Sequence, residues 1–517
     1  MTLIDFFDRG LSLAKEAVCL KEGSLSLSYT EVADWSHQIA WALHDSCIDR
    51  QSAIATYSPN NIWCYVAMLG IQRAGCIWVP LNARASIADT IAHLNRTKSV
   101  WLFYHTDHSA EIDEILAAVP TLKAAVCLNK ADGHSTDLMD WVSPTKRTPF
   151  PLPKQDPSRE IFRITSSGGT TGTPKAIIHN QVGCTTNVAT FLSLYTYSER
   201  PQYLLCMPMT HSAGSMSFHI LALGGTVHIM AKPDLDLMLD LIEQEKIHFL
   251  ALTPTSIYTL LSRPDILKRD FSSLNYLFIG AAPLSADKLT QALKVFGPVI
   301  TQSYGQTEAP TALTCMLPTD YEDIKNTPSL DYRLLSCGRA TPFARIEIMS
   351  PEGHLLPTGE RGEIVIRSGM VMQGYMNDDS SDNPNKFGWH HTGDVGYKDA
   401  DGFIYIVDRI RDLIITGGFN VFPADVEQVI WSHPAVQDCA VIGVPDEKWG
   451  ESVKAILQLK PGQSISEEQI IQFCRERLGP VKSPKTVEFW KSLPKSAVGK
   501  VLKKEIKHAV LQTLKKT

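Results

Sequence analysis

Residues Ser166 to Lys175 read Ser-Ser-Gly-Gly-Thr-Thr-Gly-Thr-Pro-Lys, a loop rich in glycine and hydroxyl groups that ends in a lysine. An apolar, β-branched stretch precedes it at 161–165, and another follows at 176–178. Glycines let a backbone approach a ligand closely, N–H groups and hydroxyls donate to phosphate oxygens, and lysine adds positive charge. The loop therefore predicts a polyphosphate site, with these candidate phosphate-binding residues: Ser167, Gly168, Gly169, Thr170, Thr171, Gly172 and Lys175.

This loop differs from the P-loop of kinases and ATPases, in which Gly-Lys is followed directly by Ser or Thr. Here Pro174 precedes the lysine and Ala176 follows it. The alternative interpretation is a flexible linker rich in Gly, Ser and Thr. The Pro-Lys ending and the apolar strand directly after it favour a phosphate-binding loop.

The bulk composition narrows the class of protein. A chain of 517 residues is too long for one core and predicts two to four domains, and 44% hydrophobic with 20% charged residues is ordinary globular composition. A net charge of −6 gives no general attraction to nucleic acid. The 11 cysteines form no Cys-x-x-Cys pair, which favours reduced thiols. We see no signal peptide and no membrane-spanning stretch, and expect a cytoplasmic protein without a nucleic-acid or membrane partner.

The first two-thirds of the chain alternates helix and strand signals. Thr30 is the expected cap of a helix whose apolar residues from Val32 to Leu43 share one face. Short apolar runs between the helices predict a mostly parallel, doubly wound sheet, and hence an α/β fold. The expected strands are 52–57, 76–80, 100–104, 124–128, 203–206, 226–230, 249–252 and 276–279.

The last third of the chain no longer alternates helix and strand signals in the same way. From about Leu334, short β signals and turns predict a small β-rich, barrel-like subdomain. A further unit begins near Arg411, and its helix after Ser466 has a capping box with Gln469 and a stop at Gly479. We therefore expect a large N-terminal domain at 1–410, with the β-rich subdomain at about 334–410, and a small α+β domain at 411–517.

Further motifs follow the phosphate loop in a fixed order. They are Tyr-Gly-Gln-Thr-Glu at 304–308, His-Thr-Gly-Asp at 391–394, Asp-Arg-Ile-Arg-Asp at 408–412, Thr-Gly-Gly-Phe-Asn-Val-Phe-Pro at 416–423 and Pro-Lys-Ser-Ala-Val-Gly-Lys at 494–500. Together these motifs closely resemble those of the adenylate-forming superfamily of acyl- and aryl-CoA synthetases, luciferases and peptide-synthetase adenylation domains. The resemblance spans about Tyr29 to Lys504. It implies that the chain activates a carboxylic acid with ATP and releases pyrophosphate.

The resemblance also implies a nucleotide site. Glu308 matches the family's Mg²⁺ ligand, which suits a hard carboxylate oxygen, and Thr307 matches a phosphate contact. Tyr304 matches the aromatic residue at adenine, Asp394 the acceptor for the ribose hydroxyls and Arg409 a donor on the ribose side. The remaining nucleotide-binding candidates are Gly280, Ala281, Ala282, Pro283, Ser303 and Gly305.

The small C-terminal domain carries the catalytic lysine of the resemblance. Lys500 matches the lysine that reaches the α-phosphate and the carboxylate, and the domain then alternates between two arrangements about a hinge at Arg411. The turn with Gly417, Gly418 and Phe419 would enter the site and form the acceptor tunnel. Two positions depart from the family pattern. Arg411 replaces the usual Asp or Lys, and 167–169 reads Ser-Gly-Gly in place of Thr-Ser-Gly.

The acyl pocket is expected around 208–215, where His211 matches the family residue that positions the acid. Together with Lys500 and Thr307, His211 completes the set of catalytic candidates. The pocket candidates are small or apolar apart from the histidine: Met209, His211, Ser212, Gly214, Ser215, Gly305 and Ala309. No Asp stands there to hold an α-amine, so an uncharged aromatic, alicyclic or medium-chain acid is expected rather than an amino acid.

The sequence leaves the acyl acceptor open. The thiol of coenzyme A is the acceptor of most free-standing relatives. The sequence at 3–10 and 79–84 is similar to that of the coronafacate ligase branch, which joins an acid to the amine of an amino acid such as isoleucine. An inert acyl-adenylate binding protein or a light-emitting relative is a further alternative, against which Glu308, Asp394 and Lys500 argue. A monomer or a homodimer is expected.

Overall fold

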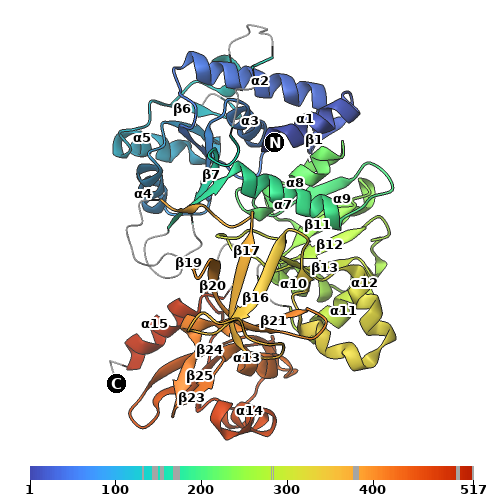
Figure 1. The fold of residues 1–517 in the computed structure, drawn as a ribbon, viewed down its shortest axis with the longest axis vertical. Helices are drawn as coiled ribbons and strands as arrows, with labels where there is room; N and C mark the ends of the chain where they lie inside the picture. The colour runs from blue at the N-terminus through green and yellow to red at the C-terminus, as the bar shows by residue number, and fades with distance from the viewer. Residues whose placement is uncertain are drawn as a thin grey trace.

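The computed structural model describes residues 1–130, 133–142, 149–151, 156–166, 175–280, 282, 284–376, 384–495 and 501–514. Two seven-stranded sheets, each with helices on its faces, form the large N-terminal part, and smaller antiparallel sheets lie toward the other end of the molecule (Figure 1). This arrangement confirms the expected α/β class. No helix among the residues described is long and apolar enough to span a lipid bilayer.

The first sheet has the strand order β18-β8-β7-β4-β3-β5-β6. Its strands are β3 (Ala53–Tyr57), β4 (Ile77–Pro80), β5 (Trp101–Tyr104), β6 (Ala124–Cys127), β7 (Ile161–Ser166), β8 (Ala176–Asn180) and β18 (Gly374–Tyr375). The five strands from β7 to β6 run parallel, whereas β8 and β18 are antiparallel to their neighbours. The phosphate loop predicted at 166–175 is therefore the connection of the β7–β8 hairpin.

The second sheet has the order β13-β12-β11-β9-β10-β1-β2. Its strands are β1 (Val18–Glu22), β2 (Leu25–Ser28), β9 (Gln202–Leu205), β10 (Thr226–Ile229), β11 (Phe249–Leu252), β12 (Tyr276–Ile279) and β13 (Ile300–Gln302). All neighbours are parallel except β1 and β2. Every strand expected from the apolar runs of this region is present within two residues of its predicted bounds.

The helices of the large part alternate with these strands. They are α1 (Leu3–Ala14), α2 (Tyr29–Asp45), α3 (Ile62–Arg73), α4 (Ile87–Thr97), α5 (Ser109–Ala118), α6 (Leu138–Trp141), α7 (Gln181–Leu194), α8 (Ser212–Ala222), α9 (Leu235–Gln244), α10 (Pro254–Leu261), α11 (Ala286–Phe296) and α12 (Pro318–Asn326). The cap predicted for α2 at Thr30 is wrong. Ser28 caps the helix, because its hydroxyl accepts from the Glu31 backbone N–H while the Glu31 carboxylate accepts from the Ser28 N–H.

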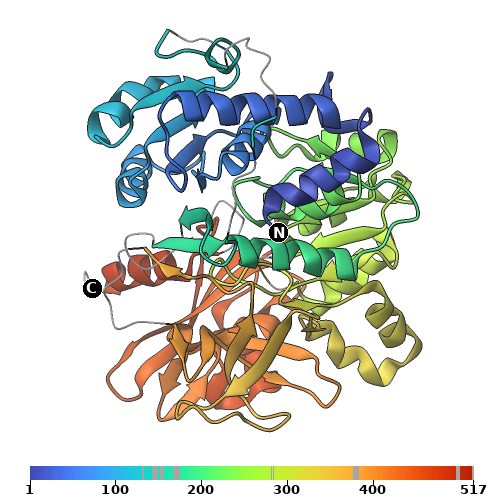
Figure 2. The ribbon, with the colours of Figure 1, turned by 45° about the horizontal axis from the view of Figure 1, so that its top comes forward.

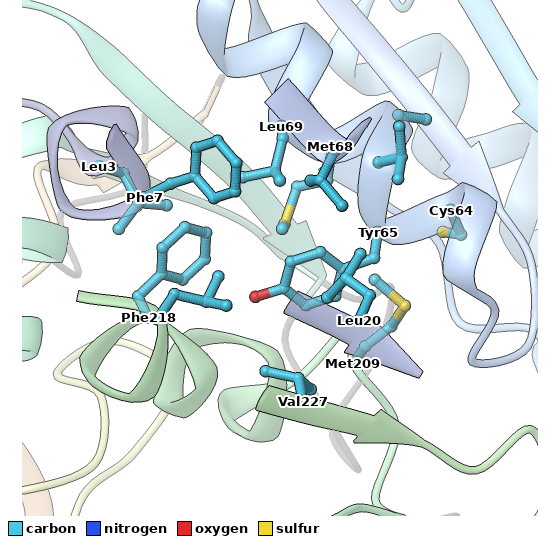
Figure 3. Close-up of a cluster of buried hydrophobic side chains, with 14 of the residues drawn as sticks. Leu3, Phe7, Leu20, Cys64, Tyr65, Met68, Leu69, Met209, Phe218 and Val227 are labelled. Atoms are coloured by element: carbon cyan, nitrogen blue, oxygen red, sulfur yellow. The ribbon is translucent and has the colours of Figure 1, made fainter. Parts of the chain in front are cut away.

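The largest apolar core lies where α1, α3 and α8 meet the second sheet. Figure 3 shows Phe7 of α1, Tyr65 of α3 and Phe218 of α8 converging above Leu20 of β1 and Val227 of β10. The Tyr65 and Ser217 hydroxyls form a buried hydrogen bond within this core. The core contains residues from both seven-stranded sheets and joins them into one body.

The β-rich segment expected from Leu334 is a five-stranded antiparallel sheet. It contains β16 (Ala344–Met349), β17 (Gly362–Ser368), β19 (Asn385–Lys386), β20 (Trp389–Lys398) and β21 (Ile404–Arg409), and β14 (Thr314–Cys315) pairs with β15 (Arg339–Ala340) beside it. The Asp-Ala-Asp-Gly turn at 399–402 joins β20 and β21, and the Asp399 N–H donates to the Phe403 carbonyl at 3.0 Å.

The C-terminal part forms its own α+β unit beyond Arg411. Its elements are β22 (Ile414–Thr416), β23 (Phe419–Val421), α13 (Pro423–Trp431), β24 (Val436–Asp446), β25 (Gly450–Leu459), α14 (Glu467–Lys482), β26 (Thr486–Phe489) and α15 (Lys503–Leu514). The capping box of α14 is confirmed, and Gly479 adopts a φ of +76° that breaks the helix. Figure 2 shows this unit on the opposite side of α7 from the blue N-terminal elements.

Candidate active site

The candidate segments lie at the carboxyl ends of parallel strands. The phosphate loop follows β7, the 280–283 turn follows β12, the 303–308 segment follows β13 and the 206–211 segment follows β9. In open α/β sheets, ligands bind at this edge because the loops that leave the strands converge there. The fold therefore brings four segments that are far apart in the sequence to one side of the two sheets.

Buried Tyr304 and Asp394 form a cluster with the half-buried Arg409 on the side predicted for the nucleoside. The Tyr304 hydroxyl donates to Asp394 Oδ2 at 2.5 Å, and Arg409 Nε lies 2.5 Å from Asp394 Oδ1. Asp394 on β20 is the register partner of Arg409 on β21, so the hairpin sets this ion pair. Burial and the Asp394 charge raise the pKa of Tyr304, which keeps its hydroxyl protonated as a donor.

A second cluster joins Lys175, Tyr375 and Glu308. Lys175 Nζ lies 4.3 Å from the centre of the Tyr375 ring, and the Tyr375 hydroxyl donates to Glu308 Oε1 at 3.0 Å. The short strand β18 brings Tyr375 to this place by pairing with β8. Sequence reasoning missed Tyr375, because nothing in the chemistry of residues 374–375 alone indicates a partner at Glu308. The other loop candidates, Ser167 to Gly172, lie outside the described residues.

Glu308 fits the predicted metal ligand. Its carboxylate contacts Tyr375, the residue that Lys175 also contacts, and its backbone carbonyl accepts from the Met372 N–H at 2.7 Å. Within the described ranges, no group of three or more His, Cys, Asp or Glu side chains could hold a metal ion. Mg²⁺ commonly binds through one or two carboxylates and the phosphates of a substrate, so a single glutamate is a suitable donor set for this ion.

The remaining nucleotide candidates are backbone features. Gly305 is a close-approach position, since a Cβ there would lie 2.8 Å from the Thr311 backbone nitrogen. Ser303 accepts from the Ala312 N–H at 3.1 Å, which ties the strand end to the 303–312 loop. Gly280 and Ala282 follow β12 and are half-buried, whereas Ala281 and Pro283 lie outside the described residues. Thr307 is half-buried in the turn closed by Gln306 and Ala309.

The acyl-pocket candidates divide into two groups. Met209 is fully buried in the main core (Figure 3), and Gly214 packs against it, because a Cβ on Gly214 would lie 2.0 Å from the Met209 carbonyl oxygen. Ala309 is also fully buried. His211, Ser212 and Ser215 start α8 and keep partial exposure. Packing therefore accounts for the residue types of the buried group, whereas the partly exposed group is accessible to a ligand.

His211 is accessible to solvent yet largely surrounded by protein atoms. This desolvation, together with the charge of Arg163, lowers the pKa of His211, so its ring is neutral at pH 7. The Thr210 hydroxyl lies 3.0 Å from Nδ1 and orients the ring. A neutral, oriented imidazole that remains accessible can contact a bound carboxylic acid.

Arg163 is the main residue that sequence reasoning missed at this pocket. It lies on β7, its side chain is buried, and its Nη1 donates to Ser215 Oγ at 3.0 Å. The expectation that the pocket holds only small or apolar residues besides His211 was therefore incomplete. A charged residue inside the apolar run 161–165 was the available signal.

The remaining candidates belong to the C-terminal part of the chain. Lys500 lies outside the described residues. Arg411 is exposed between β21 and β22, 3.9 Å from Asp412. Gly417 and Gly418 have φ values of +57° and +81° at the tip of the β22–β23 hairpin, and Phe419 there is exposed. The Gly417 N–H donates to the Trp449 carbonyl at 2.8 Å, a partner that the motif did not suggest.

Comparisons with known proteins identify the family of the chain. The family model described as AMP-binding enzyme matches residues 7–376, and the model of the AMP-binding enzyme C-terminal domain matches residues 425–500. A feruloyl-CoA synthase from Amycolatopsis sp is 30% identical over 96% of this chain and 97% of its own length. The medium/long-chain-fatty-acid–CoA ligase FadD8 of Mycobacterium tuberculosis is 38% identical over 70% of this chain, and the chain spans 64% of that relative.

A solved structure with the same architecture is the amide bond synthetase McbA from Marinactinospora thermotolerans. Its TM-score is 0.88 at 27% sequence identity, and the alignment covers 98% of this chain and 99% of that one. The relatives therefore include ligases with both kinds of acceptor that the sequence left open, a thiol and an amine.

Proposed function

The chain belongs to the AMP-binding enzyme family and is an AMP-forming acid ligase, and from this premise we propose that it transfers its acyl group to the thiol of coenzyme A. ATP is the first substrate, as membership of the family implies. The acid is activated as an acyl-adenylate with release of pyrophosphate. The thiol then displaces AMP and forms an acyl-CoA.

The observation that carries the adenylation step is the Tyr304–Asp394–Arg409 cluster. A buried aspartate that is oriented by a tyrosine hydroxyl and a guanidinium can accept hydrogen bonds from two ribose hydroxyls. The Tyr304 ring would lie against adenine. In this proposal the nucleoside would lie at the carboxyl ends of β12 and β13, where the 280–283 turn would close over the base.

We assign the triphosphate to the loop 167–172, Lys175 and Thr307. Glu308 would hold Mg²⁺, which neutralises phosphate charge when it is bound. Tyr375 fixes the direction of the Glu308 carboxylate through its 3.0 Å hydrogen bond. His211 would position the acid, and Lys500 would bring positive charge to the α-phosphate as the carboxylate attacks.

The acyl-transfer step needs a second domain arrangement in this proposal. Arg411 would be the hinge, and the turn with Gly417, Gly418 and Phe419 would line the path of the acceptor. Two contacts beside the hinge would have to change, since Arg361 Nη1 lies 3.6 Å from Asp425 and the Arg361 guanidinium lies 5.5 Å from the Phe422 ring centre.

Amide formation is the second candidate function, supported by the likeness to McbA over nearly the whole chain. In that case the acyl-adenylate would be attacked by the amine of an amino acid such as isoleucine. The nucleotide side of the site serves both reactions equally. The choice between them depends on the acceptor path, whereas an inert acyl-adenylate binder is contradicted by the family's ligase chemistry.

One experiment separates the two acceptors. The purified protein is incubated with ATP, Mg²⁺ and a panel of aromatic, alicyclic and medium-chain acids, with either coenzyme A or isoleucine, and products are identified by mass spectrometry. We expect acyl-CoA with AMP and pyrophosphate. Acyl-isoleucine without acyl-CoA would favour the amide ligase, and release of ADP in place of AMP would refute both.

A further inference from the structure

Arg163 differs from the other buried arginines of the described chain. Three arginines are buried: Arg73, Arg163 and Arg333. Arg73 lies 2.6 Å from Asp8, and Arg333 pairs with Asp401 and Asp399. Arg163 has no carboxylate partner within the described residues. A buried guanidinium is rare unless it is paired, because the charge loses its hydration without compensation.

The hydrogen-bonding capacity of Arg163 is also incompletely used. Its Nη1 donates to Ser215, but its Nε has no hydrogen-bond partner among the residues described. Two further buried polar atoms on β7 and β8 also have no hydrogen-bond partner among the residues described. They are Thr165 Oγ1 and His179 Nε2. Buried polar atoms are nearly always satisfied, so these three atoms can take a partner that the described residues do not supply.

The sheet puts these three side chains on one face. Arg163 and His179 are direct partners in the antiparallel β7–β8 pair, and Thr165 lies two residues along β7. Directly opposed residues and residues two apart project to the same side of a sheet. This face is turned toward α8, because Arg163 reaches Ser215 there.

The position along α8 indicates which part of the acid Arg163 would contact. His211, at the start of α8, is the residue proposed to position the reacting carboxylate. Ser215 follows four residues later, roughly 6 Å further along the axis. A group bound between Arg163 and Ser215 is therefore separate from a carboxylate positioned by His211.

We propose that the acid is a dicarboxylic acid, whose second carboxylate is bound by Arg163 together with Ser215. This inference rests on the proposed function, because it names the substrate class of the same pocket. It revises the expectation of an uncharged acid. A carboxylate supplies the missing counter-charge and accepts the unused N–H of Arg163.

The test compares matched acids in ATP–pyrophosphate exchange. Each dicarboxylic acid in a series of chain lengths and aromatic isomers is paired with the analogue in which the distal carboxylate is a carboxamide of the same shape. For the wild type we expect kcat/KM to favour the best diacid over its amide by about 10- to 100-fold, the range of one charge-assisted hydrogen bond. In Arg163→Met this preference should disappear.

Arg73→Met is the matched control, since it also removes a buried arginine, but one that Asp8 neutralises. We expect this variant to be less stable, with its preference for the diacid retained. Melting temperature gives a second readout. The diacid should raise the Tm of the wild type and of Arg73→Met, and should leave the Tm of Arg163→Met unchanged.

Two results would refute this inference and leave the proposed function intact. One is equal activation of the diacid and its amide by the wild type. This is the result expected if water, and not a carboxylate, accepts the unused N–H of Arg163. The other is an Arg163→Met variant that loses the same factor on both acids, which would place the arginine at the reacting carboxylate. Absence of exchange with every acid would refute the proposed function, and the Tm measurements would still decide whether Arg163 binds a dicarboxylate.

Discussion

Replacing Tyr304 with phenylalanine tests the nucleoside side of the site with little change in shape. The aromatic ring stays, while the hydroxyl that donates to Asp394 at 2.5 Å is lost. Asp394 keeps Arg409 at 2.5 Å and is free to turn toward it. A hydrogen bond to a charged group contributes about 1.5–3 kcal/mol, so we expect the free energy of unfolding to fall by about this amount.

The same change should weaken ATP binding. If about half of the lost energy serves to orient Asp394 toward the ribose, the KM for ATP rises roughly three- to tenfold, since 1.36 kcal/mol corresponds to a factor of ten. The kcat of exchange should change much less, because the ribose hydroxyls do not take part in the bond that forms. ATP titrations in the pyrophosphate-exchange assay measure both parameters.

Tyr321→Phe is the matched control. Tyr321 is equally a buried tyrosine, and its hydroxyl donates at 2.6 Å to Gln302 Oε1, a neutral acceptor. This variant should lose about 1 kcal/mol of stability and keep the wild-type KM for ATP. Equal KM increases in both variants, or no increase in Tyr304→Phe despite its lower stability, would refute the nucleoside assignment.

Three further changes test other parts of the molecule. Lys500→Ala should slow adenylation by about 10²- to 10³-fold while ATP still binds by calorimetry; exchange at the wild-type rate would contradict its role. Gly417→Ala, whose Cβ would lie 2.6 Å from the Trp449 ring at a φ of +57°, should impair acyl transfer more than pyrophosphate exchange, unlike Gly462→Ala, where φ is +76° in open space. Burial lowers the pKa of His219 to about 3, so the unfolded state binds the extra proton below about pH 6.5 and stability falls on acidification. Urea unfolding from pH 7 to pH 5 should show His219→Gln with a mean slope smaller by about 1 kcal/mol per pH unit, and an unchanged slope would disprove the shift.

The sequence predicted the parts of the fold that depend on local patterns. Buried strands such as 249–252 and 276–279 are recognisable because parallel strands covered on both faces are continuously apolar. The cap of α2 was misplaced by two residues, because Thr30 and Ser28 are both good caps and only the reciprocal bond with Glu31 decides between them. Which of two neighbouring residues caps a helix depends on the hydrogen bonds of the folded chain, and the residue types alone do not contain that information.

The candidate site was predictable where its chemistry lies in contiguous motifs. Tyr304, Glu308 and Asp394 stand in such motifs. Tyr375 and Arg163 do not, since their partners come from other elements: β18 pairs with β8 to bring Tyr375 to Glu308, and α8 packs on β7 to bring Ser215 to Arg163. Long-range pairing of this kind is decided by the assembled sheet.

The strand β18 has a consequence for how the protein is made. It covers the outer edge of β8, where the Gln373 N–H donates to the Ile178 carbonyl and the Met376 N–H to the Ala176 carbonyl, each at 2.8 Å. During translation β8 leaves the ribosome long before this covering strand is synthesised. Its edge remains open to pairing with other nascent chains until then, and unpaired edges of this kind favour aggregation. Premature termination before Gly374 would make that exposure permanent, and the truncated product would keep an unpaired edge on the β7–β8 hairpin.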